Sequence, residues 1–377
     1  MANTAFYYDD AFVHYKFSDS HPLRQERLGM VDRLLDAYGL YAQDKAARLK
    51  PTPATREELL SVHSEAYLDA LAALSAGEWH PHAREFGLGP GDNPPFVGMW
   101  EASLLYAGAS RDAARWVLDA AGRTAFNSSG GLHHAFRAKA SGFCLVNDNA
   151  LAAVVARQAG KRVAYVDIDA HHGDGTQAIF YADPDVLTLS LHETGRTLFP
   201  GGGFPGEIGE GAGAGCSVNV PMAPHATDEH YFYAFDEIVE PVLRAYDADF
   251  IILQVGADAH WQDPLAHLML TSQGWLALVR RVLSASAGKP LICLGGGGYN
   301  IRTVARLWTL LQADLAGVAL PDTVPEPLAT EFGITRLHDV ARPEIPESDR
   351  QAAWEYVRES VAELKELVGE RYGLSVK

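Results

Sequence analysis

The segment Arg162–Gln177, RVAYVDIDAHHGDGTQ, decides the fold, because a short apolar run is followed at once by carboxylates and imidazoles. An apolar run without alternation is typical of a strand buried on both faces of a parallel sheet. We predict this strand over Arg162–Ile168. Five further short runs predict strands, and several of them are apolar nearly throughout: Thr124–Asn127, Val186–Leu191, Cys216–Val220, Phe250–Val255 and Leu291–Leu294.

Stretches of helical periodicity separate these strands. They are Phe96–Ala120, Val146–Ala159, Asp228–Tyr246, Ser272–Ala285 and Ile301–Leu315. Strand alternating with helix predicts an α/β fold, with a mainly parallel sheet flanked by helices on both faces.

The last part of the chain has a different composition. Residues 321–346 contain five prolines and are predicted to form an extended wrap that buries Phe332, Ile334 and Leu337. An amphipathic helix over Asp349–Val368 is expected to follow. We therefore predict one domain over residues 1–377, with a catalytic core at 1–317 and a C-terminal wrap and helix at 318–377.

Charge and cysteine content exclude several classes of protein. The 377 residues include 31 Lys+Arg and 48 Asp+Glu, a formal net charge of −17. A surface of that sign repels phosphate backbones and anionic lipid, so we expect neither nucleic acid nor a membrane as partner. The three cysteines form no CxxC pair, which favours a reducing, cytoplasmic location over a disulfide scaffold.

Three side chains after two strands have the character of metal ligands. In an open parallel sheet, ligands bind beyond the carboxyl ends of the strands. Asp169 and His171 are two residues apart, which places them on one face of an extended segment, and Asp258 follows another strand. Three protein ligands and an open position suit catalytic Zn²⁺, and the two carboxylates make Fe²⁺ possible as well.

Acid–base groups occur at the same edge of the sheet. The adjacent His133 and His134 follow a strand and suit proton transfer, with Asp167 and Asp174 as candidate partners that would fix their tautomers. Tyr299 follows four glycines, which predict a bend lying close to another backbone. Its phenol could donate a hydrogen bond to a developing oxyanion.

Five motifs in this order resemble the histone deacetylase superfamily, in particular its class I-like bacterial members of the acetoin-utilisation type. The motifs are GGLHHAFRAKASGFCLVND (130–148), YVDIDAHHGDGTQ (165–177), LSLHETGRTLFPGG (189–202), LQVGAD (253–258) and LGGGGYN (294–300). With the opening HPLRQERLGMVDRLLDAYGL, the resemblance covers roughly residues 5–317. It implies a single-domain arginase/deacetylase-type fold with a sheet of about eight strands.

The resemblance also implies a role for each matching residue. Zinc would be held by Asp169, His171 and Asp258. His134 backed by Asp174 would be the general base and acid, His133 paired with Asp167 its electrostatic partner, and Tyr299 the oxyanion donor. The substrate would be bound by Phe143, Phe199, Gly142 and Asp92 at the tunnel and rim, with Arg27 in an internal channel. A structural potassium ion would be held by Asp167, Asp169, His171, Ser190 and Leu191.

The implied reaction is hydrolysis of acetyl-lysine side-chain amides in proteins by metal-activated water. Deacetylation of acetylpolyamines or other small acetylated amines is the alternative, and Leu265 weakens it because polyamine-selective relatives carry an acidic residue there. A binuclear manganese ureohydrolase would share the fold but needs a second set of acidic ligands. A binding protein without activity is a further alternative. It would not need the family's catalytic residues, whereas in this sequence every catalytic position is filled.

Overall fold

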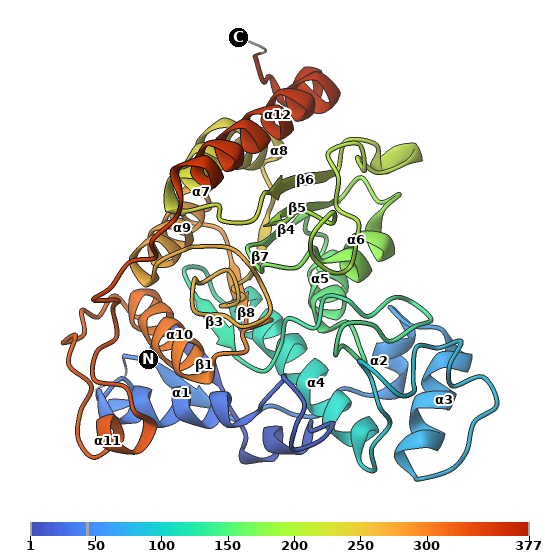
Figure 1. The fold of residues 1–377 in the computed structure, drawn as a ribbon. Helices are drawn as coiled ribbons and strands as arrows, with labels where there is room; N and C mark the ends of the chain where they lie inside the picture. The colour runs from blue at the N-terminus through green and yellow to red at the C-terminus, as the bar shows by residue number, and fades with distance from the viewer. Residues whose placement is uncertain (1, 43–44, 376–377) are drawn as a thin grey trace.

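A parallel sheet runs through the middle of the molecule (Figure 1). The computed structural model describes residues 2–42 and 45–375, and within these ranges eight strands form one sheet in the order β2-β1-β3-β8-β7-β4-β5-β6. All neighbouring strands are parallel. They are β1 (Thr4–Tyr7), β2 (Ala47–Leu49), β3 (Thr124–Asn127), β4 (Val163–Asp167), β5 (Val186–Glu193), β6 (Ser217–Met222), β7 (Phe250–Gln254) and β8 (Leu291–Leu294).

Helices cover both faces of this sheet (Figure 1). They are α1 (Glu26–Ala37), α2 (Arg56–Leu60), α3 (Glu65–Ser75), α4 (Met99–Leu118), α5 (Asp148–Gln158), α6 (Asp174–Phe180), α7 (Asp228–Ala234), α8 (Glu240–Tyr246), α9 (Ser272–Ala285), α10 (Ile301–Leu315), α11 (Leu328–Phe332) and α12 (Glu347–Tyr372). Successive residues of β3 show the two faces: Phe126 packs on Trp308 of α10, while Asn127 donates to Ser110 of α4. The predicted α/β architecture is thus confirmed.

The six predicted strands are confirmed, with small shifts at their ends. One shift matters for the site. The strand β4 ends at Asp167 rather than Ile168, so the metal-ligand candidates Asp169 and His171 lie in a loop and not in an extended strand. The two edge-side strands β1 and β2 were not predicted, because runs of four and three residues carry too little periodicity.

The helix predicted over Asp228–Tyr246 is interrupted. A π-helical turn at Phe235–Val239 separates α7 from α8. Pro241 stands just after this turn and has no N–H to donate to the carbonyl four residues earlier, so the α-helical ladder cannot continue through it. The helices predicted over Ser272–Ala285 and Ile301–Leu315 have the predicted ends.

The C-terminal segment lies on the surface of the core and returns to the sheet (Figure 1). As predicted, Ile334 and Leu337 are buried, whereas Phe332 is half-buried at the end of the short helix α11. The carboxylate of Asp339 accepts hydrogen bonds from His260 Nε2 (2.8 Å) and Ser272 N (2.8 Å). The wrap is therefore fastened to the loop that follows β7.

Two further observations concern the helices and the cysteines. None of the helices in the described residues is long and apolar enough to cross a membrane. All three cysteines are buried and unpaired.

The sheet order explains why distant motifs meet. The strands β3, β8, β7 and β4 are consecutive neighbours in the sheet, although they are far apart in the sequence. Because parallel strands end at the same edge, the loops after these four strands lie next to one another. These loops carry the motifs with the histidine pair, the tyrosine and the candidate metal ligands.

Candidate metal centre and catalytic site

The side chains of Asp169, His171 and Asp258 converge on one point. Nδ1 of His171 lies 2.9 Å from Asp258 Oδ2 and 3.3 Å from Asp169 Oδ1. All three residues are buried, and one ligand atom from each lies within 4.8 Å of the others. Within the described residues this is the one group of three such ligands, so the geometry corresponds to a site for a single ion.

The electrostatics of these groups favour a cation. Burial, reinforced by the charge of Asp169, raises the pKa of Asp258 to about 7. Burial opposes protonation of His171, but Asp169 and Asp258 outweigh it and raise the pKa of its imidazole. Two buried carboxylates beside an imidazole thus require a positive charge, either a proton or a metal ion. The donor set of two oxygens and one nitrogen fits Zn²⁺ or Fe²⁺.

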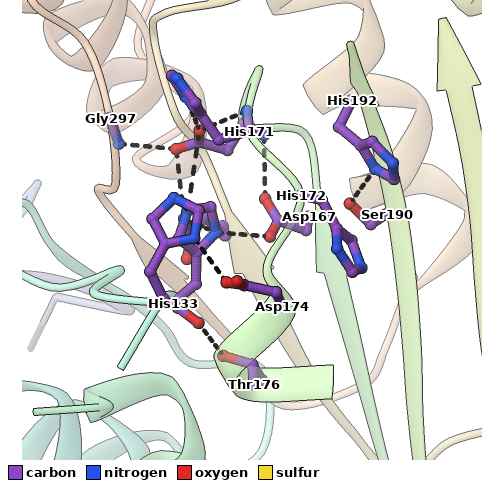
Figure 2. A network of polar contacts seen from close by, with 12 residues as sticks. His133, Asp167, His171, His172, Asp174, Thr176, Ser190, His192 and Gly297 are labelled. Atoms are coloured by element: carbon purple, nitrogen blue, oxygen red, sulfur yellow. Dashed lines mark hydrogen bonds and ion pairs between the residues drawn. The ribbon is translucent and has the colours of Figure 1, made fainter. Parts of the chain in front are cut away.

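Backbone amides orient both carboxylates. Asp258 Oδ1 accepts from Ala170 N (2.8 Å), and Asp169 Oδ2 accepts from Gly297 N (2.7 Å), as Figure 2 shows for Gly297. A Cβ at Gly297 would lie 2.1 Å from Asp258 Oδ2, so only glycine fits at this position. The glycine run therefore forms the close backbone approach that its sequence predicted.

The histidine pair lies beside this centre, and each imidazole contacts its predicted carboxylate. His133 Nδ1 lies 2.9 Å from Asp167 Oδ2 (Figure 2). His134 Nδ1 lies 2.7 Å from Asp174 Oδ1. The two Nε2 atoms are 3.0 Å apart. Only one proton can lie between them, so one imidazole donates and the other presents a lone pair.

The surroundings decide which imidazole donates. Burial lowers the pKa of His133, but Asp167 and Asp169 overcome this effect and raise it to about 9. Burial, with the neighbouring His133 charge, lowers the pKa of His134 to about 4 in spite of Asp174. These opposite shifts favour His133 as the donor and His134 as the acceptor in the contact between the two Nε2 atoms.

Residues at the start of α5 hold the turn that contains His133 and His134. Asp148 accepts hydrogen bonds from Gly131 N (3.0 Å) and Leu132 N (2.7 Å), directly before the pair. Asn147 donates through Nδ2 to Ala135 O (2.9 Å), directly after it. The side chains of His133 and His134 thus stand on a turn that is fixed at both ends.

Tyr299 stands at the end of the glycine loop, which three charged side chains hold. Arg27 is buried and donates to Gly298 O (2.9 Å) and Gly296 O (3.0 Å). Asp263 accepts from Tyr299 N (2.7 Å), while Asp169 holds the loop through Gly297. Burial raises the pKa of the Tyr299 phenol well above its usual value, so the group stays a hydrogen-bond donor.

Aromatic side chains enclose the centre. The ring of Phe199 lies 4.9 Å from His134 and is 40% exposed, and the ring of Phe143 lies 5.8 Å from Tyr299. Phe143 adopts φ +68°, a strained conformation that is held by Tyr15 Oη donating to its carbonyl (3.0 Å). A side chain at Gly142 would collide with His134 and Phe199.

One cavity joins seven of the predicted site residues. Its walls include Arg27, His133, His134, Gly142, Phe143, Asp169 and Tyr299. Cys144 also lines this cavity, and its thiol donates to Gly142 O (3.3 Å). The structure therefore brings the histidine pair, Phe143, Tyr299 and the channel residue Arg27 to a single space.

Two predicted substrate residues lie further out. Asp92 is exposed, and its carbonyl is 3.3 Å from His21 Nε2, whose ring packs on Phe143. Leu265 is half-buried and donates its N–H to Asp263 (2.9 Å). The hydrogen bonds that Asp92 and Leu265 form here use their backbone atoms and do not reach the histidine pair or Tyr299. Their roles at the rim stay predictions.

Sequence reasoning missed three polar residues that contact the centre. Tyr165 Oη donates to Asp167 (2.7 Å), and Gln254 Nε2 lies 2.8 Å from His133 Nδ1. Both are in strands, where a polar residue within an apolar run was the available signal. Asp263, five residues after Asp258 in the same loop, could have been found from its place at the carboxyl end of β7.

A parallel α/β sheet that delivers this metal centre, two carboxylate-backed histidines and a phenol to one edge defines a metal-dependent hydrolase of the arginase/deacetylase type. The histone deacetylase domain model matches residues 21–315, and the chain belongs to the histone deacetylase family. It is therefore a deacetylase, and the predicted family and fold are confirmed.

Individual relatives agree with this assignment. The chain is 39% identical to the acetoin utilization protein AcuC of Bacillus subtilis, over 86% of this chain and 85% of that protein. It is 36% identical to the histone deacetylase clr6 of Schizosaccharomyces pombe, over 85% and 78%. The crystal structure of a histone deacetylase homologue from Aquifex aeolicus superposes with a TM-score of 0.85 at 30% identity, covering 94% of this chain and all of that one.

Proposed function

We propose that this protein is a zinc-dependent lysine deacetylase of the cytoplasm, which hydrolyses acetyl-lysine side-chain amides in proteins to lysine and acetate. One observation carries the proposal: His134, whose Nδ1 contacts Asp174, and Tyr299 line the same cavity beside Asp169. Asp169, His171 and Asp258 would hold the zinc, with Fe²⁺ as the other metal that fits. When bound, the ion polarises the acyl carbonyl and acidifies the attacking water.

Proton transfer falls to His134. Its Nδ1–H donates to Asp174, so the lone pair is at Nε2, which lies 3.0 Å from His133 Nε2. The attacking water would take the place of that contact and give its proton to Nε2. The carboxylate of Asp174 stabilises the imidazolium that results. His134 then returns this proton to the departing lysine amine. The contact between Asp167 and His133 would keep the positive charge of the His133 imidazole beside His134.

The oxyanion is the second charge that develops. Tyr299 would donate its phenolic hydrogen to the acyl oxygen, and this bond strengthens as the negative charge grows. Phe143 and Phe199 would enclose the apolar lysine stem, and the Gly142 carbonyl would accept the substrate amide N–H. Asp92 at the rim would hold the substrate backbone.

A monovalent cation site is supported by the hydrogen bonds of Ser190. His192 Nε2 lies 2.9 Å from Gly203 O, a pure acceptor, so this nitrogen carries the proton. Nδ1 must then accept, and Ser190 donates its hydroxyl hydrogen to it at 2.7 Å (Figure 2). The Ser190 lone pairs are left for a cation beside Asp167, its register partner in β4. Potassium would be held there with oxygens of Asp169, His171 and Leu191.

The substrate class is tested with the zinc-loaded protein by comparing kcat/KM for an acetyl-lysine peptide and for acetylated polyamines. We expect the peptide to be preferred, because Leu265 presents no acidic group to a second ammonium. A higher value for the polyamines would establish the alternative, a deacetylase of small acetylated amines. Two tightly bound transition metals per chain would contradict the single-ion site.

A further inference from the structure

The distance between the metal ligands and the Tyr299 phenol is set by two loops. The β7 loop (residues 257–265) carries Asp258, and the β8 loop (residues 295–300) carries Tyr299. Three hydrogen bonds join them: Ala257 N to Gly297 O (2.9 Å), Tyr299 N to Asp263 Oδ2 (2.7 Å) and Asn300 Nδ2 to Gln262 O (3.2 Å). The β7 loop therefore carries a metal ligand near one end and a support for the phenol near the other.

Asp263 is the only charged group in these three bonds. It is 8% exposed, and both its oxygens accept backbone N–H groups, one from Tyr299 and one from Leu265 at 2.9 Å. Burying a carboxylate costs free energy unless such donors compensate it. The fold thus keeps a costly buried group whose hydrogen bond ends on the backbone of the catalytic tyrosine.

The loops touch without a gap next to this bond. Gly298 has φ +133°, and a Cβ there would lie 2.6 Å from Val304 Cγ2 and 3.1 Å from Ala257 Cβ. Glycine permits this contact but provides no side chain to hold the backbone in place. The hydrogen bond from Tyr299 N to Asp263 supplies that constraint.

We propose that Asp263 is a positioning residue for deacetylation, which fixes the Tyr299 phenol relative to the metal ligand on its own loop. The inference rests on the proposed function. Asp263 acts through Tyr299, so its contribution disappears when the phenol is absent. A misplacement of about 1 Å at such a group can cost ~10²-fold in rate.

A double-mutant cycle tests this role. Asp263→Asn keeps the shape but replaces an acceptor oxygen with an amide group that donates. We expect kcat to fall roughly 10- to 100-fold with KM and zinc content unchanged. In the Tyr299→Phe background the same change should cost less than about 3-fold. Equal losses in both backgrounds, or a kcat of Asp263→Asn near that of the wild type, would overturn the proposal.

Asp228→Asn is the matched control. Asp228 is another carboxylate whose oxygens accept from Thr271 N (2.9 Å) and Thr271 Oγ1 (2.8 Å), but it holds the N-cap residue of α9 instead of the β8 loop. We expect it to lower Tm and to cost the same small factor in kcat with or without the phenol. Asp263→Glu keeps the charge and moves the acceptor by one CH₂, so it should show a Tyr299-dependent loss even where Asp263→Asn does not fold.

The affinity for SAHA, the ligand of a histone deacetylase homologue with 30% identity and a TM-score of 0.85, separates this proposal from the proposed function. A hydroxamate carbonyl would accept from the phenol, so Asp263→Asn should weaken SAHA binding only when Tyr299 is present. Wild-type protein that binds SAHA but hydrolyses no acetyl amide would contradict the proposed function, whereas the binding cycle would still decide the role of Asp263.

Discussion

Two adjacent histidines have opposite proton affinities because they face different charges. His133 contacts Asp167 and lies 3.9 Å from the carboxylate of the candidate ligand Asp169. Among the described residues, Asp174 is the carboxylate that His134 contacts, and the charge of His133 lowers the pKa of His134. A like charge at hydrogen-bond distance disfavours a second proton. The pKa of His133 is therefore raised and that of His134 lowered, which makes His134 the candidate base of the pair.

Removal of the phenol is expected to reduce turnover without disturbing the metal. Tyr299→Phe keeps the ring contacts with Phe143 and His171 but loses the oxyanion donor. Loss of one such donor typically costs ~10²–10³-fold in kcat. Turnover is measured on an acetyl-lysine peptide, with zinc content as the control. Turnover near that of the wild type would contradict the assigned role.

His63 makes stability depend on pH. It is fully buried, its Nδ1 lies 3.0 Å from Phe136 O, and its Nε2 accepts from Asn147 N (2.9 Å), so it must be neutral in the fold. Burial lowers its pKa from 6.5 to about 4. As the pH falls from 6.5 towards 4, the unfolded chain binds a proton at His63 that the folded chain does not bind. The free energy of unfolding therefore falls by up to ~3 kcal/mol over this range, whereas above pH 6.5 His63 does not lower it.

Denaturant unfolding at pH 7, 6 and 5 measures this effect. We expect the free energy of unfolding to fall less steeply with acid in His63→Gln than in the wild type, because the variant lacks the titrating ring. Replacement of the exposed His82 is the control and should leave the slope unchanged. Identical slopes for the wild type and His63→Gln would refute the assignment.

At the scale of elements, the site depends on which strands are neighbours. The sequence predicted six strands and the residues at their ends, including the pairs His133–Asp167 and His134–Asp174. It could not predict the partners that depend on strand order, such as Asp263 with Tyr299, since these residues come together only because β7 and β8 pair. Gln254 and Tyr165 were missed because their strands read as apolar.

The glycine loop after β8 yields a prediction for this scale. Gly297→Ala would place a methyl group 2.1 Å from Asp258 Oδ2, so that the carboxylate or the loop must move. We expect the variant to lose zinc, measured as metal content per chain after dialysis. Gly206→Ala is the control, because a Cβ there meets nothing within 4 Å. Full zinc content in Gly297→Ala would contradict this prediction, because it would mean that the loop moves without displacing the carboxylate of Asp258.

At the scale of the whole molecule, the segment beyond residue 315 lies outside the family domain yet packs on it. Leu337 is fully buried, its carbonyl accepts from Arg306 Nε (2.9 Å), and Asp339 nearby contacts the loop after β7. Leu337→Ala should lower the free energy of unfolding by ~2–5 kcal/mol. Val340→Ala, at a side chain that is 79% exposed, should change it little. If Leu337→Ala changed the free energy of unfolding as little as Val340→Ala, the segment would not stabilise the core.

The place of β8 in the sheet has a consequence for biosynthesis. It is the last strand made, yet it fills the middle of the sheet, between β3 and β7. Until residue 294 has left the ribosome, those two strands present open edges, and such edges recruit other chains. A nascent chain therefore has to be shielded until its final strand arrives, and any message truncated before that codon would yield an aggregating, inactive product.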